Sequence, residues 1–239
     1  MNIGLIGYGK MGKAIEKIAL DRGHKITAKS NSQNPITNID FSKIDVAIEF
    51  SEPNLALNHI KYCVKKNTPI IVGTTAWEDD LPMISDYVKE NNGSMLHASN
   101  FSIGVNIFFE INKKLARLIS FKNEYKPSIE ETHHTEKKDS PSGTAISLVK
   151  DIIHEKNKYD SWILQKKEVT KKSSNQIPIK SIRKEQTIGQ HEITYESHID
   201  TIKIKHIAKN RDGFALGSII AAEWIINKKG VFTMHDLIK

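Results

Sequence analysis

Apolar residues recur along the first hundred positions in two alternating patterns. Short runs with little polar interruption, such as 45–50 (DVAIEF), are typical of buried parallel strands, whereas apolar residues three and four apart, as in 55–64, indicate helices. We predict strands at 3–6, 24–29, 45–50, 69–72 and 94–98, and helices at 14–19, 55–64 and 81–88. Strands that alternate with helices pair in parallel, so the predicted fold class is α/β with a doubly wound sheet that binds ligands at its strands' carboxyl ends.

The pattern changes after residue 120. The ranges 188–197 and 201–207 alternate as strands do, and the apolar range 215–226 has helical spacing. We therefore expect a second, α+β domain at 104–213 with a mainly antiparallel sheet, while 1–103 and 214–239 form the first domain. The range 156–180 is rich in Lys and Ser with little periodicity, and we interpret it as variable, partly mobile surface.

A glycine turn follows the first predicted strand directly. The sequence GYGKMG stands between that strand and a helix, where small residues let a pyrophosphate approach the backbone and the helix start favours its charge. The alternative is a tight structural turn without a ligand. The candidate cofactor-binding residues here are Gly7, Tyr8, Gly9, Lys10, Met11 and Gly12.

Proton donors and a second helix start lie close together at 131–144 (ETHHTEKKDSPSGT). Pro141 suits a first helical turn, and Ser142 and Gly143 leave backbone N–H groups available, so a carboxylate could bind there. His133, His134 and Lys137 should lie on the connection from a strand to this helix. A polar surface loop with a capped helix is the alternative. We expect no metal site, because adjacent histidines point apart on an extended chain and no cysteine cluster accompanies them.

Composition narrows the choice of function. The formal charge of +7 is compatible with nucleic-acid binding, with attraction of anionic small molecules, or with a lysine-rich composition; 31 of the 35 basic residues are lysines, and these are dispersed. We favour a lysine-rich composition as the main reason for the charge, with some attraction of anionic small molecules, and we expect no nucleic-acid partner. Cys63 excludes an internal disulfide framework, and its helical spacing predicts buried packing. No apolar run reaches membrane-spanning length and no leader precedes the first strand, so we expect a cytoplasmic protein.

The order of residues in 130–144 closely resembles the E-x-x-H-H-x-x-K-x-D-x-P-S-G-T signature of the dihydrodipicolinate reductase family. The matching residues are Glu130, His133, His134, Lys137, Asp139, Pro141, Ser142, Gly143 and Thr144. GYGKMG resembles the family's G-x-x-G-R-M-G turn, one residue shorter and with Lys10 in place of arginine. The range 189–192 resembles G-E-H-E with Gln190 substituted, and 211–217 resembles R-x-x-F-A-x-G, so the likeness spans almost the whole chain.

This resemblance implies an NADPH- or NADH-dependent reductase of lysine and diaminopimelate synthesis. Its substrate would be a cyclic dicarboxylate, (2S,4S)-4-hydroxy-2,3,4,5-tetrahydrodipicolinate, and the second domain would also assemble a homotetramer. It implies catalytic roles for His133 and Lys137, and substrate binding by His134, Ser142, Gly143 and Thr144. The implied cofactor-lining segments beyond the glycine turn contain Phe50, Ser51, Gly73, Thr74, Thr75, Ala98, Ser99, Asn100 and Phe101.

Cofactor choice depends on the end of the second predicted strand. Many dinucleotide sites have an acid there that accepts both ribose hydroxyls, but this chain has Asn31 in its place. Lys29 could attract a 2′-phosphate or point to solvent, so we expect use of either cofactor with a preference for NADPH. Two rival classes are another two-domain dehydrogenase, which would have no reason to carry HHTEKKDSPSGT, and a silent dinucleotide-binding regulator, which would need neither His133 nor Lys137.

Overall fold

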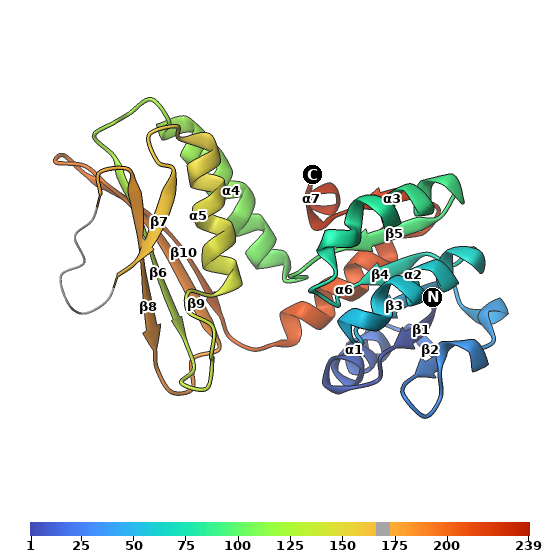
Figure 1. Ribbon diagram of the computed structural model, residues 1–239. Coiled ribbons are helices and arrows are strands. Elements are labelled where there is room, and N and C mark those ends of the chain that lie inside the picture. Colours follow the sequence, from blue (N-terminus) through green and yellow to red (C-terminus); the bar gives the residue numbers. More distant parts are fainter. Residues whose placement is uncertain (166–172) are drawn as a thin grey trace. The chain divides into compact units, whose positions relative to one another are not determined.

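The computed structural model describes residues 1–165 and 173–239, which form two compact units (Figure 1). One unit is Met1–Asn106 with Asp212–Lys239, and the other is Ile107–Arg211. The chain leaves the first unit within helix α4 (Ile103–Ile119) and returns to it just before helix α6 (Asp212–Ile225). Among the described residues, no helix is both long and apolar enough to cross a membrane.

The first unit contains a six-stranded sheet in which all neighbouring strands are parallel. Its order is β11-β5-β4-β3-β1-β2. The strands are β1 (Asn2–Ile6), β2 (Lys25–Ser30), β3 (Val46–Glu49), β4 (Ile70–Val72), β5 (Ser94–His97) and β11 (Gly230–Phe232). The order reverses at β1, because β2 lies on one side of it and β3 on the other, and ligands bind at such a reversal in doubly wound folds. The predicted doubly wound sheet is confirmed.

Helices cover both faces of this sheet because its strands are apolar on both sides. Ile3 and Leu5 pack with α1 (Lys10–Asp21) and α6, whereas Ile6 packs with α2 (Pro53–Lys65) and α3 (Leu81–Glu90). Cys63 is fully buried on α2, as predicted. The remaining helical segments are α7 (Met234–Ile238) and three 3₁₀ turns, Ile36–Asn38, Phe41–Lys43 and Glu78–Asp80.

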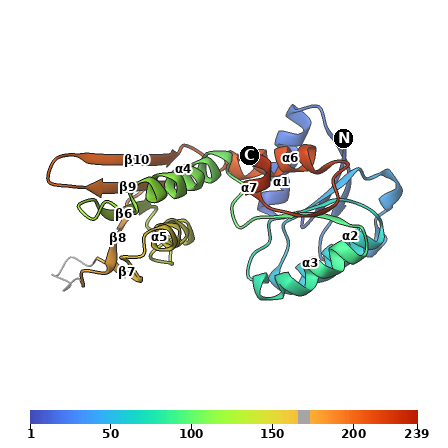
Figure 2. The ribbon, with the colours of Figure 1, turned by 90° about the horizontal axis from the view of Figure 1, so that it is seen from above.

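The second unit contains a five-stranded sheet of order β10-β9-β6-β8-β7. The strands are β6 (Lys126–His133), β7 (Ser161–Leu164), β8 (Gln176–Arg183), β9 (Gly189–Glu196) and β10 (Thr201–Ala208). β9 pairs antiparallel with β6 and β10, as the predicted α+β class requires, and β8 pairs parallel with β6 and β7. Figures 1 and 2 show that α4 and α5 (Gly143–Glu155) lie on the same face of this sheet.

One sequence interpretation is wrong for the residues that the structure describes. The range 156–180 contains β7 and the first part of β8, which belong to the sheet rather than to variable surface. Lys156 is fully buried, and its ammonium donates to the carbonyl oxygens of Ile119 (3.0 Å) and Lys122 (2.7 Å) at the end of α4. The part of this prediction that concerns residues 166–172 lies outside the described residues.

Candidate active site

The predicted cofactor-binding residues of the first unit all follow its parallel strands. They lie after β1 (Gly7, Tyr8, Gly9, Lys10, Met11 and Gly12), β2 (Asn31), β3 (Phe50 and Ser51), β4 (Gly73, Thr74 and Thr75) and β5 (Ala98, Ser99, Asn100 and Phe101). Because the carboxyl ends of parallel strands share one edge, the fold brings these segments to the ligand-binding side of the sheet.

The glycine turn brings together the ends of the neighbouring strands β1 and β3. Gly7 has φ +90°, and a Cβ there would lie 2.1 Å from the carbonyl oxygen of Phe50, so only glycine allows β1 and β3 to end this close together. Similarly, a Cβ on Gly12 would lie 2.6 Å from the carbonyl oxygen of Gly7. These two glycines are required by the fold itself.

Gly9 differs, because the fold does not require it. A Cβ at this position would meet no atom within 4 Å, and its φ of −91° is open to any residue. Gly9 caps the start of α1 without a side-chain hydrogen bond, and no acidic residue lies in the first turn. The open space and the uncapped, positive helix start fit the pyrophosphate of a dinucleotide.

The other strand ends are held together by polar and aromatic contacts. The backbone N–H of Ser51 donates to Thr74 Oγ1 at 2.8 Å, and a Cβ on Gly73 would lie 2.2 Å from the ring of Phe50. The Phe101 ring is only 2% exposed and lies in the core against Phe50, with ring centroids 5.7 Å apart. Phe101 therefore supports the cofactor-lining segment from behind, and its side chain is not available as a ligand contact.

A buried acid behind these residues has no counterpart in the sequence interpretation. Glu49, the last residue of β3, is fully buried, and its Oε1 accepts from the hydroxyl of Ser51 and from the backbone N–H of Ser51 at 3.1 Å. Nδ1 of His59 lies 3.4 Å from the same oxygen. A charged residue within the otherwise apolar run 46–50 was the signal that could have revealed this cluster.

The end of β2 has a paired lysine rather than a free one. Nζ of Lys29 lies 2.6 Å from Glu16 Oε1 and 3.1 Å from the hydroxyl of Tyr8, which itself hydrogen-bonds Glu16. Hydrogen bonds from Lys29 and Tyr8 lower the pKa of Glu16, and the bond to Glu16 raises the pKa of Lys29. The side-chain oxygen of Asn31 accepts from the backbone N–H groups of Gln33 and Asn34, both at 2.9 Å.

In the second unit, the signature residues connect β6 to α5. His133 ends β6, and Ser142 caps α5 by accepting from the backbone N–H of Ala145 at 3.2 Å. Pro141 therefore precedes the cap and does not lie in the first helical turn as predicted. A Cβ on Gly143 would meet no atom within 4 Å, so the start of α5 has open space comparable to that at Gly9. Thr144 is half-buried beside it.

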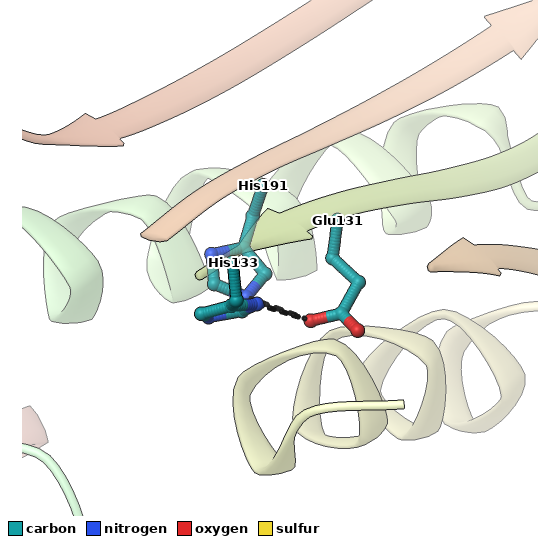
Figure 3. Close-up of side chains that lie close together, drawn as sticks. All are labelled: Glu131, His133 and His191. Carbon is teal, nitrogen blue, oxygen red and sulfur yellow. Dashed lines mark ion pairs between the residues drawn. The ribbon is translucent and has the colours of Figure 1, made fainter. Parts of the chain in front are cut away.

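Three side chains converge at the end of β6 (Figure 3). Nδ1 of His133 lies 2.7 Å from Oε2 of Glu131, and Nε2 of His191 lies 3.9 Å from the same oxygen. All three are buried, and cross-strand pairing places His191 of β9 opposite Glu131. Nε2 of His191 also lies 3.0 Å from the hydroxyl of Ser142, so this cluster contacts the start of α5.

Burial and local charge set the protonation of this cluster. Burial alone would raise the pKa of Glu131, but the neighbouring His133 imidazole and Ser142 hydroxyl outweigh that effect and lower it. Burial, reinforced by the charge of His133, lowers the pKa of His191 to about 3. Glu131 is thus an anion and His191 a neutral hydrogen-bonding residue at neutral pH.

Glu131, His133 and His191 also have the residue types and spacing of a metal site, with ligand atoms within 4.8 Å of one another. The 2.7 Å between Glu131 Oε2 and His133 Nδ1 is an ion-pair distance, shorter than the roughly 3.4 Å between two ligands of one tetrahedral ion. The other carboxylate oxygen lies 3.2 Å from the guanidinium of Arg183, a cation already in place. We therefore interpret the cluster as a carboxylate that holds an imidazole.

The turn after His133 contains Lys137, which forms a short ion pair with Asp139. Nζ of Lys137 lies 2.8 Å from Oδ1 of Asp139, and this ammonium holds the pKa of Asp139 below its usual range. Sequence reasoning gave no role to Glu131, His191 or Arg183. Glu131 lies two residues before His133 on one face of a strand, and His191 lies in the range 189–192 that resembles the family's G-E-H-E segment, so both had a readable signal. Arg183 comes from another strand and gave none.

Comparisons with known proteins identify the family. The model "Dihydrodipicolinate reductase, N-terminus" matches residues 1–101, and "Dihydrodipicolinate reductase, C-terminus" matches residues 104–238. The chain belongs to the dihydrodipicolinate reductase family. It is 44% identical over 238 residues to the 4-hydroxy-tetrahydrodipicolinate reductase of Christiangramia forsetii, covering 100% of this chain and 98% of the relative. The Rickettsia rickettsii protein of the same name is 35% identical over 244 residues, with 100% and 99% covered.

The fold agrees with this membership. A solved structure described as dipicolinate-bound dihydrodipicolinate reductase from Paenisporosarcina sp. TG-14 superposes with a TM-score of 0.76 at 21% identity, covering 98% of this chain and 97% of that one. The resemblance inferred from the signature is confirmed, and the chain is an oxidoreductase with a dinucleotide-binding domain for a nicotinamide cofactor.

Proposed function

We propose that this protein reduces (2S,4S)-4-hydroxy-2,3,4,5-tetrahydrodipicolinate to (S)-2,3,4,5-tetrahydrodipicolinate with NADPH or NADH and a proton, releasing water, in lysine and diaminopimelate synthesis. The observation that carries the proposal is the buried Glu131 carboxylate 2.7 Å from His133 at the end of β6, linked through His191 and Ser142 to the start of α5. Full-length relatives that carry the reductase name support it.

Each residue of the β6–α5 connection has a role in this proposal. His133, oriented by Glu131, donates a proton to the substrate, because imidazole is suited to proton transfer near neutral pH. Lys137 donates a proton or stabilises charge on the nitrogen side of the ring. His134, Gly143 and Thr144 bind carboxylate oxygens at the start of α5, where N–H groups and the helix dipole favour an anion. The Ser142 hydroxyl is buried and engaged with Ala145 and His191, so we assign it to shaping this helix start.

The nicotinamide cofactor supplies the hydride, and the first unit binds it. We propose that the segments after β1, β3, β4 and β5 line its site, with the pyrophosphate against Gly9 and the start of α1. The pairing of Lys29 with Glu16 tempers the expected preference for NADPH, because part of the lysine's charge is already neutralised. We therefore propose use of both cofactors. The assignment of 1–103 with 214–239 to cofactor and of 104–213 to substrate belongs to the same proposal.

A homotetramer and a cytoplasmic location complete the proposal. α4 and α5 cover one face of the β7–β10 sheet. Glu192 alternates along β9 with the buried His191 and Ile193, so it lies on the other face, where Lys203 and Lys205 pair with it at 3.1 and 3.2 Å. From the sequence we expect the segments 192–195 and 202–204 to need covered edges, but 192–195 belongs to β9, which is interior; the edges of this five-stranded sheet are β10 and β7. Light scattering tests the assembly, and a concentration-independent, fully active monomer would contradict it.

The activity is tested by forming the unstable hydroxylated dicarboxylate in a coupled synthesis and following nicotinamide absorbance. We expect oxidation of both cofactors that depends on the substrate-forming enzyme. His133→Gln and Lys137→Ala should each lower kcat by at least about 100-fold with little change in dinucleotide affinity, the usual contribution of a placed acid or base. Absence of oxidation with either cofactor would refute the proposed function.

Dipicolinate provides a probe that does not depend on turnover. The solved relative is described as dipicolinate-bound, and this planar dicarboxylate resembles the proposed product in its two carboxylates. We propose that this chain binds it at the start of α5. Calorimetry should detect binding that Gly143→Val weakens.

A further inference from the structure

Arg183 contacts three parts of the candidate active site. As the last residue of β8, it pairs in register with His133 of β6. Nη1 of Arg183 donates to Glu131 Oε1 at 3.2 Å, so this guanidinium and His133 occupy opposite oxygens of one buried carboxylate. The side chain is 22% exposed, which leaves the ion pair only partly screened by water.

The same guanidinium also holds the turn that carries Lys137. Nη2 donates to the carbonyl oxygen of Asp139 at 2.6 Å, and Nε donates to the carbonyl oxygen of Lys137 at 3.4 Å. Both acceptors are backbone atoms, so Arg183 constrains the path of the chain between them. The Lys137 ammonium in turn pairs with the Asp139 carboxylate at 2.8 Å.

We propose that Arg183 is a positioning residue that fixes His133 and Lys137 relative to each other. It connects the carboxylate that orients one proposed proton donor to the backbone that carries the other. The effect on catalysis rests on the proposed function. The attachment of the turn to Glu131 through Arg183 does not depend on which substrate is bound. Arg183 itself need not contact the substrate.

Lysine cannot replace the guanidinium in this role. A planar fork with donors on three nitrogens reaches a carboxylate and two carbonyl groups in different directions, whereas an ammonium is a single point charge. Arg183→Lys should therefore keep the attraction to Glu131 and lose the attachment of the turn. Arg183→Met should lose both.

A matched control lies on the same two strands. Lys180 of β8 pairs with Glu130 of β6 at 2.8 Å, and both side chains are about half exposed, so Lys180→Met removes an ion pair between β6 and β8 without touching Glu131. For wild type, Arg183→Lys, Arg183→Met and Lys180→Met, we would measure kcat, dipicolinate affinity, thermal midpoint, and hydrogen exchange of the peptide 134–140.

We expect both Arg183 variants to lower kcat by about 10- to 100-fold, the effect of misplacing a catalytic group by about 1 Å. Dipicolinate affinity should fall less than kcat does, because two of its proposed ligands, Gly143 and Thr144, lie at the start of α5 and only His134 lies in the turn that Arg183 holds. Exchange in 134–140 should accelerate in the Arg183 variants, and Lys180→Met should match wild type in every measurement.

Three results would overturn the inference. Arg183→Lys with kcat within about twofold of wild type would show that the fork is not needed. Loss of kcat without faster exchange would show that Arg183 acts on the reaction rather than by positioning. An equal loss of dipicolinate affinity and kcat would make it a ligand contact. If wild type shows no turnover, the proposed function fails, but hydrogen exchange in Arg183→Lys still tests whether Arg183 holds the turn 134–140. If Arg183→Met does not fold, Arg183→Lys alone tests the inference.

Discussion

Two glycines that the fold does not require provide a sharp test of where the two ligands bind. Gly9 and Gly143 begin α1 and α5, and a Cβ at either position would meet no atom within 4 Å. Neither has a positive φ, so alanine fits both backbones without strain. We expect Gly9→Ala to weaken binding of the dinucleotide selectively and Gly143→Ala to weaken binding of the dicarboxylate selectively.

The magnitude follows from what the added methyl group displaces. An anion held by backbone N–H groups would be forced from at least one of them, and a hydrogen bond to a charged group is worth about 1.5–3 kcal/mol. The Michaelis constant or Kd of the affected ligand should therefore rise by about 10- to 150-fold. The constant of the other ligand should stay within about threefold of wild type.

Stability separates this effect from general damage. Alanine in place of Gly143 in α5 should raise the free energy of unfolding by up to about 1 kcal/mol. Alanine in place of the N-cap residue Gly9 should lower it by a similar amount, since glycine caps helices better than alanine. Despite these opposite changes in stability, Gly9→Ala should bind the dinucleotide more weakly and Gly143→Ala should bind the dicarboxylate more weakly.

The assay is steady-state kinetics with each ligand varied in turn, together with thermal unfolding. Gly7→Ala is the control, because its φ of +90° and the 2.1 Å approach to Phe50 predict a loss of stability that affects both ligands. If Gly9→Ala and Gly143→Ala leave both Michaelis constants unchanged, the open spaces at the two helix starts are not ligand sites.

Three further predictions concern individual side chains. Burial lowers the pKa of His191 from 6.5 to about 3, so its contribution to stability is complete above pH 6.5 and should fall by about 2 kcal/mol between pH 7 and pH 5; urea titrations of His191→Gln should show a flatter pH dependence, and an unchanged one would contradict the buried neutral imidazole. Lys156→Met removes two buried hydrogen bonds from an ammonium to carbonyl groups, each of which keeps one backbone donor, and should cost about 1–3 kcal/mol of unfolding free energy. Lys158→Met, on an exposed contact of 3.4 Å, should cost almost none. Equal costs for the two variants would argue against the buried role of Lys156. Glu16→Gln should release Lys29 and raise the NADPH to NADH ratio of kcat/KM by about two- to fivefold at low salt, and a ratio independent of this change would show that the pair does not contact the ribose.

The parallel unit was predictable because its signals are local. β1, β3, β4 and β5 each contain a short apolar run, and the helices predicted between the strands repeat their apolar residues at the spacing of one face. Glycine at positions 7 and 12 also carries readable information, because the close approaches there tolerate no side chain. The segments at the strand ends then follow from topology, since a parallel sheet places all its carboxyl ends along one edge.

The second unit was harder to predict because its order depends on partners distant in sequence. β7 has only four residues, all half-buried, so their alternation is weak, and its place in the sheet depends on pairing with β8. Lys156 is the clearest case: a lysine in a lysine-rich stretch gives no sign of burial, and only the end of α4, more than thirty residues away, provides its acceptors. The composition of 156–180 therefore indicated a surface segment, although contacts with distant residues bury Lys156 and place β7 in the sheet.

The same distinction explains which active-site residues the signature contained. Groups proposed to meet the substrate, such as His133, Lys137 and Gly143, lie within one short connection, where a sequence pattern can place them. The groups that hold them come from β8 and β9, and their positions follow from strand register: His191 lies opposite Glu131, and Arg183 lies beside His133. A buried carboxylate is costly unless it is paired, so Glu131 requires both partners to remain ionised. Because its two oxygens face a histidine on one side and an arginine on the other, the acid that the sequence presents as an ordinary strand residue determines where the proposed proton donor can lie.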